Sequence, residues 1–391
     1  RQNILANPRA VVQVLHPQTA EIFRLHIRYL RTETAGPLFE GMRAQLAGIA
    51  SHSGMEGVFR LLGSDVYEVE TVEEVEGEPL PAAPVRGGQL AAVRRCSEHL
   101  ARCATLEDAL NAVLRTLNDA LGVRHAMVLM LDASAERLYT VASSGYATSG
   151  VGSELCVGQG VVGVAARERT PVRIGHMTNA ALYSQAMRHS LASHMPDFDP
   201  ATEIPYPGLA QPHSQLAAPI LSAGRLLGVL FVESPDELQF SWEHEDALVA
   251  MAGHLGATID LVQTPAEPAE AAAPAPQAAV PAAGGTPLQL RRYASNGSIF
   301  IDGEYLIKGV AGAILWKLAH EHQQQGRTDF SNRELRLDPA IGLPDGSDNL
   351  EARLVLLQRR LAEQSPHLRI EKTGRGRFRL LVGRPLALVA G

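Results

Sequence analysis

The segment VGQGVVGVAARERTPVRI, residues 157–174, places two glycines between apolar stretches. Residues 154–157 before them are a strand candidate. Gly158 and Gly160 permit a tight turn from that strand into a helix, because glycine adopts backbone conformations that other residues avoid. Residues 171–174, at the end of the segment, are the next strand candidate. The segment therefore predicts strand, turn, helix and strand in succession.

The sequence on either side predicts more strands and two capped helices. Thr105 begins a helix as its N-cap, with Asp108 at the third position, and Gly122 ends it. A last helix begins after Ser241 and continues to Ile259. Strand candidates occupy residues 125–131, 138–142, 215–220 and 226–233. This order predicts an α+β fold with a central antiparallel sheet flanked by helices.

Several blocks resemble the signature of the GAF domain family. They are the 157–174 segment, SQLAAPI at 214–220, GRLLGVL at 224–230 and FSWEHED at 240–246. They follow one another in the family's order and indicate a GAF domain at residues 86–262. The resemblance implies a sensor that holds a small molecule under a helix and loop, which here is the connection 175–214.

That connection is rich in side chains that bind ligands. It holds four of the chain's 14 histidines, and its ligand candidates are His176, Tyr183, His189, His194 and His213. Imidazole suits haem iron or a soft transition metal. No pair has a chelating spacing, however, so scattered surface histidines are the other interpretation. No residue is assigned as a metal ligand, and the cofactor stays unknown.

Cys156, just before the glycine turn, is the remaining ligand candidate. Its thiolate could act as a redox sensor or nucleophile, whereas a buried structural cysteine is the alternative. Some GAF relatives reduce free methionine sulfoxide with cysteines, which gives a remote enzyme alternative. The cysteines here match no catalytic set, so we expect no enzyme.

The C-terminal residues 288–391 predict a second fold. Two short strands at 299–301 and 305–307 precede a helix around 313–319, and Ser331 with Glu334 forms a capping box. A helix from about Asp348 and a hairpin at 368–382 complete the order. This order resembles the winged helix-turn-helix domain of OmpR/PhoB-type response regulators. The resemblance implies DNA contacts through Asn349, Arg353, Arg359, Arg360, Lys372, Arg375 and Arg377.

One pair of residues departs from that family's pattern. Val355 and Leu356 stand where family members present basic residues to DNA. An apolar pair on an exposed helix face invites a protein contact. The alternative function is therefore a signalling adaptor whose winged helix docks on a protein partner.

Charge and composition divide the chain between these domains. Residues 288–391 contain 16 basic and 11 acidic residues, whereas the other 287 contain 19 and 31. A basic domain on an acidic body is expected where only that domain meets a polyanion. Residues 263–287, rich in Ala and Pro, predict a linker. In residues 1–85, apolar spacing predicts a helix around 20–30 and a second from 42 to 62, followed by an alternating strand at 66–70.

The whole sequence indicates a cytoplasmic one-component transcriptional regulator. Three cysteines fit a reducing compartment, and no apolar stretch is long enough to span a membrane. The GAF domain would sense a small molecule or redox signal, and the winged helix would bind double-stranded DNA. We expect a homodimer, because the flanking helices of GAF domains commonly pair.

Overall fold

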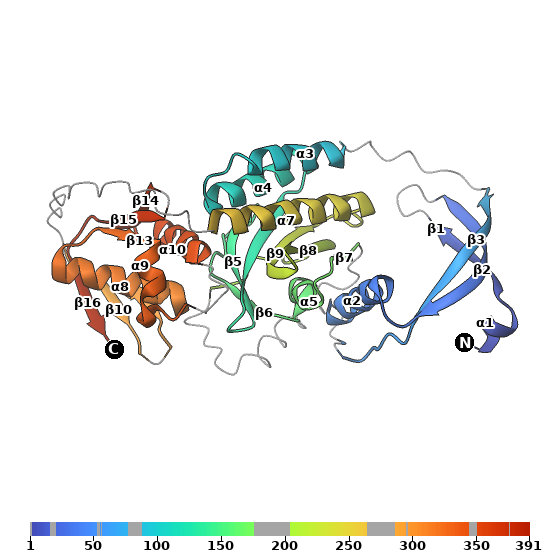
Figure 1. Ribbon diagram of the computed structural model, residues 1–391, viewed down its shortest axis with the longest axis horizontal. Helices are drawn as coiled ribbons and strands as arrows, with labels where there is room; N and C mark the ends of the chain where they lie inside the picture. The colour runs from blue at the N-terminus through green and yellow to red at the C-terminus, as the bar shows by residue number, and fades with distance from the viewer. Residues whose placement is uncertain are drawn as a thin grey trace.

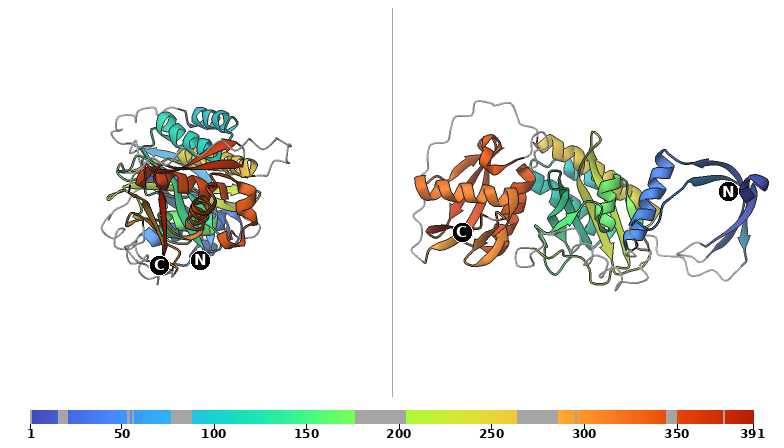
Figure 2. Two further views of the ribbon diagram at one scale, coloured as in Figure 1. Left: turned by 90° about the vertical axis from the view of Figure 1, so that its left-hand side faces the viewer. Right: turned by 90° about the horizontal axis from the view of Figure 1, so that it is seen from below.

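The computed structural model describes residues 2–15, 21–52, 55, 57–76, 88–175, 204–263, 286–294, 296–343, 350–374 and 376–391. They form three parts in a row along the long axis of the molecule (Figure 1). The central domain (88–175 and 204–263) lies between an N-terminal module (2–76) and a C-terminal domain (286–391). Two further views show the same arrangement (Figure 2).

A six-stranded antiparallel sheet is the base of the central domain, in the order β6-β5-β4-β9-β8-β7. One face is covered by three helices and the other by α5 (Figure 1). This α+β architecture confirms the fold class predicted for this part of the chain. The strands are β4 (His125–Asp132), β5 (Arg137–Ser144), β6 (Glu154–Cys156), β7 (Val172–Ile174), β8 (Ser214–Ser222) and β9 (Arg225–Ser234). The helices are α3 (Gln89–Leu100), α4 (Leu106–Leu121), α7 (Trp242–Gln263) and α5 (Gly160–Glu168).

Local sequence signals set the ends of these elements. The Thr105 hydroxyl accepts a hydrogen bond from the Asp108 backbone N–H at 3.1 Å, and Gly122 ends α4 in the left-handed conformation. Gly158 has a φ of +93°. At Gly163 a Cβ would lie 2.5 Å from the carbonyl oxygen of Cys156. A larger side chain is therefore not tolerated at Gly158 in the turn or at Gly163 in α5.

The N-terminal module differs from its prediction. Residues 22–33, whose apolar positions suggested a helical period, form strand β2 (Ile22–Glu33) between β1 (Arg9–Leu15) and β3 (Ser64–Val75). Phe23, Leu25 and Ile27 stand at alternate positions, which fits a strand at least as well as a helix. Pairing on both edges of β2 decides between the two periods. The other elements are α1 (Gln2–Ala6) and α2 (Pro37–His52), and residues 59–62 are not helical.

Helix α2 joins this module to the central domain. Its Ser51 hydroxyl accepts a hydrogen bond from the backbone N–H of Gly160, the first residue of α5, at 3.0 Å. Arg43 also pairs with Glu168 at 2.8 Å. The module therefore contacts the sheet face that carries α5, on the side away from α3, α4 and α7 (Figure 1).

The C-terminal domain has two sheets and three α-helices among its described residues. Strand order is β12-β11-β10-β16 in one sheet and β13-β15-β14 in the other, with β16 parallel to β10. The Ser331 capping box is present. The strands are β10 (Leu288–Arg292), β11 (Ile299–Ile301), β12 (Glu304–Ile307), β13 (Asp329–Ser331), β14 (Leu368–Gly374), β15 (Arg377–Val382) and β16 (Leu386–Ala390). The helices are α8 (Gly309–Gln325), α9 (Asn332–Leu337) and α10 (Leu350–Gln364), with a 3-10 turn η2 (Pro339–Ile341).

Most of the predicted linker, residues 264–285, lies outside the described residues. No described helix combines the length and the apolar character that a bilayer crossing requires.

Candidate functional site

A cavity of about 500 Å³ opens at one end of the central sheet. One wall comes from the end of α4 and the start of β4, and the other from the end of β9 and the connection to α7. Its polar lining includes both signs of charge, with Arg124, His125, Glu233, Asp236, Gln239 and His244. Leu121, Val123 and Phe240 add apolar surface. A concave site with a few convergent polar groups is typical of small-molecule binding.

Glu233 is the buried acid of this cavity, with a residue exposure of 2%. Its carboxylate accepts hydrogen bonds from the backbone N–H of Leu209 at 2.8 Å and from the Gln215 side chain at 3.0 Å. Burial raises the pKa of Glu233, and the hydrogen bonds from Leu209, Gln215 and Tyr146 offset that rise only in part. A carboxyl group perturbed in this way is a frequent feature of binding and catalytic sites.

Two histidines lie near this acid. The His125 and Tyr146 rings lie 5.4 Å apart, and burial followed by the charge of Arg124 lowers the pKa of His125. On the far wall, the Nδ1 atom of His244 accepts a hydrogen bond from the Ser241 backbone N–H at 3.2 Å. These groups can donate and accept hydrogen bonds, so the cavity suits a polar ligand that carries an ionisable group.

Sequence analysis did not single out Glu233. The signal was present, because a carboxylate ends the otherwise apolar run RLLGVLFVE at residues 225–233. An ionisable side chain at the end of a buried strand is costly unless it is hydrogen-bonded or paired, so such a residue is a candidate for attention. The same reasoning applies to His125, which opens the apolar strand β4.

Only two of the predicted ligand residues lie within the described part of the chain. The His213 backbone N–H donates to the carbonyl of Ser234, a cavity residue, at 2.8 Å, and its ring lies 3.8 Å from Glu237. Cys156 is the last residue of β6 and lies opposite Arg137 in the β5–β6 ladder, at the far end of the sheet from His125. Outside the described residues lie His176, Tyr183, His189 and His194.

The haem and transition-metal interpretation depends mainly on the residues that are not described. Among the residues that are, no group of three or more His, Cys, Asp or Glu side chains is arranged to hold a metal ion.

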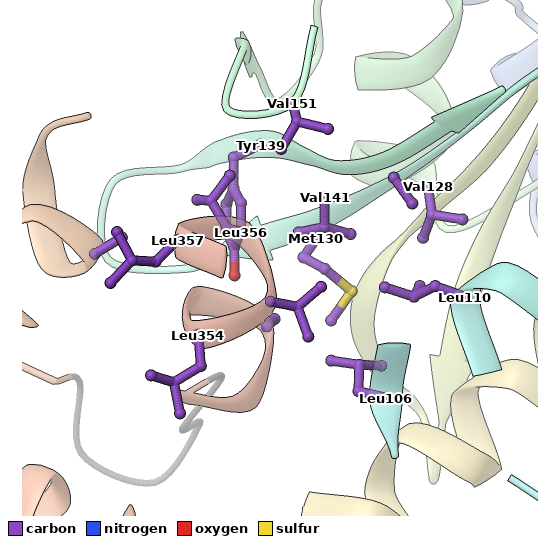
Figure 3. Close-up of a cluster of buried hydrophobic side chains, with 14 of the residues drawn as sticks. Leu106, Leu110, Val128, Met130, Tyr139, Val141, Val151, Leu354, Leu356 and Leu357 are labelled. Carbon is purple, nitrogen blue, oxygen red and sulfur yellow. The ribbon is translucent and has the colours of Figure 1, made fainter. Parts of the chain in front are cut away.

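The second candidate site is a contact between α10 and the central domain. Figure 3 shows Leu356 of α10 beside Tyr139 of the central sheet, whereas Leu354 and Leu357 lie on the other side of α10; all belong to one continuous apolar cluster with the central sheet and α4. The central-domain members labelled there are Leu106, Leu110, Val128, Met130, Tyr139, Val141 and Val151. The helix that resembles a recognition helix is therefore packed on the other domain.

Arg353 is the main polar contact of this interface. Its guanidinium pairs with the Asp132 carboxylate and lies over the Tyr139 ring, 3.9 Å from the ring centroid. The Arg353 and Asp132 side chains are only 11% and 17% exposed. Burial alone would raise the pKa of Asp132, but the Ser134 hydrogen bond and the Arg353 charge outweigh it and hold that pKa below its ordinary value. The ion pair is thus partly desolvated and oriented by an aromatic face.

Three further contacts surround this ion pair. Arg359 donates to the Asn111 side-chain oxygen on α4 at 2.8 Å. The Ser149 hydroxyl, in the loop between β5 and β6, donates to Glu363 at 2.5 Å. A Cβ at Gly152 would lie 3.6 Å from Leu356, so that loop approaches α10 closely. The contact therefore includes α4, β4, β5 and the loop that follows β5.

Val355 and Leu356 are 0% and 3% exposed. The sequence predicted that this apolar pair would meet protein or else interrupt a DNA-binding face. Both side chains belong to the cluster that extends across the two domains, so this chain's own central domain provides a protein contact for them.

The other predicted DNA-binding residues lie in two settings. Arg360 is buried, donates to the carbonyl of Leu306 at 3.1 Å and pairs with Glu363. Lys372 on β14 pairs with Glu351 at 3.0 Å, and Arg377 on β15 is exposed. Asn349 and Arg375 lie outside the described residues. The hairpin residues are thus more accessible than those of α10.

Comparison with known proteins identifies the central domain. Residues 103–260 match the sequence model of the GAF domain family, so this part of the chain is a GAF domain, as the sequence blocks indicated. No curated protein matches the chain.

Several solved structures are similar to this chain. The GAF domain of a phosphoenolpyruvate-protein phosphotransferase from Acinetobacter is 23% identical over 44% of this chain and 93% of that one, with a TM-score of 0.35. The corresponding domain from Coxiella burnetii is 22% identical over 44% and 94%, with a TM-score of 0.34. A free methionine-R-sulfoxide reductase from Neisseria meningitidis, in complex with its substrate, is 18% identical over 46% and 93%, with a TM-score of 0.35.

Proposed function

We propose that this GAF-containing chain is a cytoplasmic one-component transcriptional regulator, in which the GAF domain senses a small molecule and the C-terminal domain binds DNA. The observation that carries the proposal is the composition of the C-terminal domain around α10. A helix with a basic end, Arg359 and Arg360, precedes a basic hairpin with Lys372 and Arg377.

The order of the C-terminal elements supports a winged helix of the OmpR/PhoB type. Strands β10, β11 and β12, then α8, α9 and α10, and then the β14–β15 hairpin follow the order of that domain, and β16 joins the first sheet after the hairpin. In such domains the third helix enters the major groove and the hairpin touches the adjacent backbone. Residues 349–379 contain eight basic and three acidic residues, which favours contact with phosphates.

The sensing half of the proposal is supported by the cavity beside Glu233. Its charges of both signs suit a polar molecule, and the apolar surface of Phe240 suits a small organic one. Mass spectrometry of small molecules released from the denatured purified protein tests this half directly. A stoichiometric compound that is absent from a Glu233→Leu variant supports ligand binding in this cavity.

Two observations bear on the earlier alternatives. Val355 and Leu356, which suggested the adaptor, are buried and belong to the cluster shared with the GAF domain. Cys156, on which the reductase alternative depends, lies at the end of β6 and does not line the described cavity. We therefore propose a regulator without enzyme activity.

A homodimer is also part of the proposal. Leu90 on α3 and Val249 and Leu261 on α7 are exposed apolar side chains on the helical face of the GAF domain. Exposed apolar side chains gathered on paired helices suit a contact with a second copy. Sedimentation of the full chain, compared with a Leu90→Glu, Leu261→Glu variant, measures whether this face associates.

DNA binding is tested on the full chain with a fluorescent random-sequence duplex. We expect binding in dilute buffer that weakens steeply with salt, because phosphate contacts release counterions. The double variant Lys372→Ala, Arg377→Ala should bind DNA more weakly, and its affinity should depend less steeply on salt concentration. Absence of binding in dilute buffer, in the wild type and in a variant with α10 released, would overturn the regulator.

A further inference from the structure

We infer that the GAF domain carries a docking site for α10 that competes with DNA for the same helix face. This inference rests on the proposed function and names its regulation. The docking site is the surface formed by Asn111, Asp132, Tyr139, Ser149 and Gly152.

The competition follows from which residues the contact uses. Arg353 and Arg359 are predicted DNA contacts, and both are engaged by GAF side chains, Arg353 by Asp132 and Arg359 by Asn111. Because the Arg353 side chain is only 11% exposed in this contact, it cannot reach a phosphate at the same time. Of the predicted DNA contacts that the structure describes, the docked chain therefore presents only Lys372 and Arg377 of the hairpin.

The chemistry of the docking site resembles that of the nucleic acid it excludes. Asp132 supplies a carboxylate for Arg353, and the Tyr139 ring supplies a flat π-face, as phosphate and base do in DNA. Val355 and Leu356 add an apolar surface that gains no favourable contact with DNA. Both side chains are buried in the docked chain. The helix is thus matched to two mutually exclusive partners.

The ligand cavity and the docking site share two rigid elements. Strand β4 begins at His125 in the cavity and ends at Asp132 in the docking site. Helix α4 contacts α10 through Asn111 and ends in the cavity at Leu121. Seven strand steps separate the two ends of β4, about 23 Å at about 3.3 Å per residue. A ligand that displaces either element at the cavity therefore acts on the α10 contact.

The test weakens the docking site from the GAF side and leaves every predicted DNA contact unchanged. Asp132→Asn is suited to this, because Oδ1 accepts hydrogen bonds from Ser134 and Ala135 while Oδ2 pairs with Arg353. Asparagine keeps the first set and places an amide donor against the guanidinium. Asn111→Lys, on α4, adds a cation beside Arg359 and suits a helix.

A matched control changes an Asp–Arg pair elsewhere on the GAF domain. Asp260→Asn removes the carboxylate charge that pairs with Arg225 at 2.6 Å, on α7 and β9. The variant has the same change in charge as Asp132→Asn and leaves the α10 contact intact. Ser149→Glu, which sets a carboxylate against Glu363, is a second, independent way to weaken docking.

Two measurements are made on each full-length protein: affinity for a random-sequence duplex and hydrogen exchange of the α10 amides. The apparent affinity equals the intrinsic affinity multiplied by the fraction of molecules in the undocked state. We expect Asp132→Asn with Asn111→Lys to bind DNA at least about tenfold more tightly than the wild type. Its α10 amides should exchange faster, Ser149→Glu should change both measurements in the same direction, and Asp260→Asn should match the wild type.

The outcomes separate this inference from the proposed function. If the wild type and the variants whose α10 amides exchange faster bind DNA with equal affinity, the proposed competition is overturned. The protein would still be a DNA-binding protein. Unchanged α10 exchange in both docking variants would show that the contact does not hold the helix, and would also overturn it. If α10 is released and the protein still does not bind DNA in dilute buffer, the proposed regulator function is overturned instead.

Discussion

Leu356→Ala measures how much the interface holds the two domains together. The Leu356 side chain is 3% exposed and approaches Gly152 of the GAF domain. Replacing a buried leucine by alanine costs about 2–5 kcal/mol, from lost apolar contact and the cavity that remains. We expect about 2–3 kcal/mol here, because a contact between two domains can close over a cavity more easily than a core can.

Urea denaturation of the full chain, followed by circular dichroism, gives the assay. The matched control is Leu337→Ala on α9, where the same chemical change removes a side chain that is 73% exposed. That variant should lose less than about 0.5 kcal/mol, as surface substitutions do. A loss of the same small size for Leu356→Ala would refute the packing described for α10.

Three other predictions follow from single residues. Because the pKa of Glu233 is raised in the fold, its contribution to stability is complete below the unfolded pKa and is lost as pH rises through the folded one. Glu233→Gln should therefore flatten the fall in melting temperature as pH rises above the ordinary carboxyl range, and an unchanged slope would contradict this. Burial raises the pKa of Cys96 to about 11, so a maleimide at neutral pH should label Cys96 only on unfolding, as peptide mass mapping can show; rapid labelling of the native protein would be inconsistent with it. Thr105→Ala removes the α4 N-cap and should cost about 1 kcal/mol in a urea titration, whereas Thr258→Ala, at a half-buried position inside α7 whose hydroxyl donates only to the His254 carbonyl, should cost less.

The sequence was most informative where local chemistry decides structure. The caps at Thr105 and Ser331 and the turn at Gly158 follow from backbone geometry within a few residues, and all three are present. The GAF domain predicted from the sequence blocks was confirmed for the same reason. Those blocks are strand ends and tight turns, whose structure depends on a few neighbouring residues. Strand β2 was misassigned because its alternating apolar positions fit two periods, and only pairing with β1 and β3 selects one.

The candidate sites depended on contacts far apart in the chain. Val355 and Leu356 indicated a protein contact, but nothing local in the sequence identifies the partner. The contact between Arg353 and Asp132 spans 221 positions, and that between Arg359 and Asn111 spans 248. The cavity likewise combines the end of α4 with the end of β9. Such pairings arise only from tertiary packing.

The stacking of Arg353 on Tyr139 has a consequence for how such chains diverge. Lysine at position 353 would keep the charge but lose the planar contact with the Tyr139 ring. Descendants of this chain should therefore exchange residues 132, 139 and 353 together and seldom singly. Under the proposed competition, a chimera that joins this C-terminal domain to a foreign sensory domain without the Asp132–Tyr139 pair should bind DNA without restraint from α10 docking.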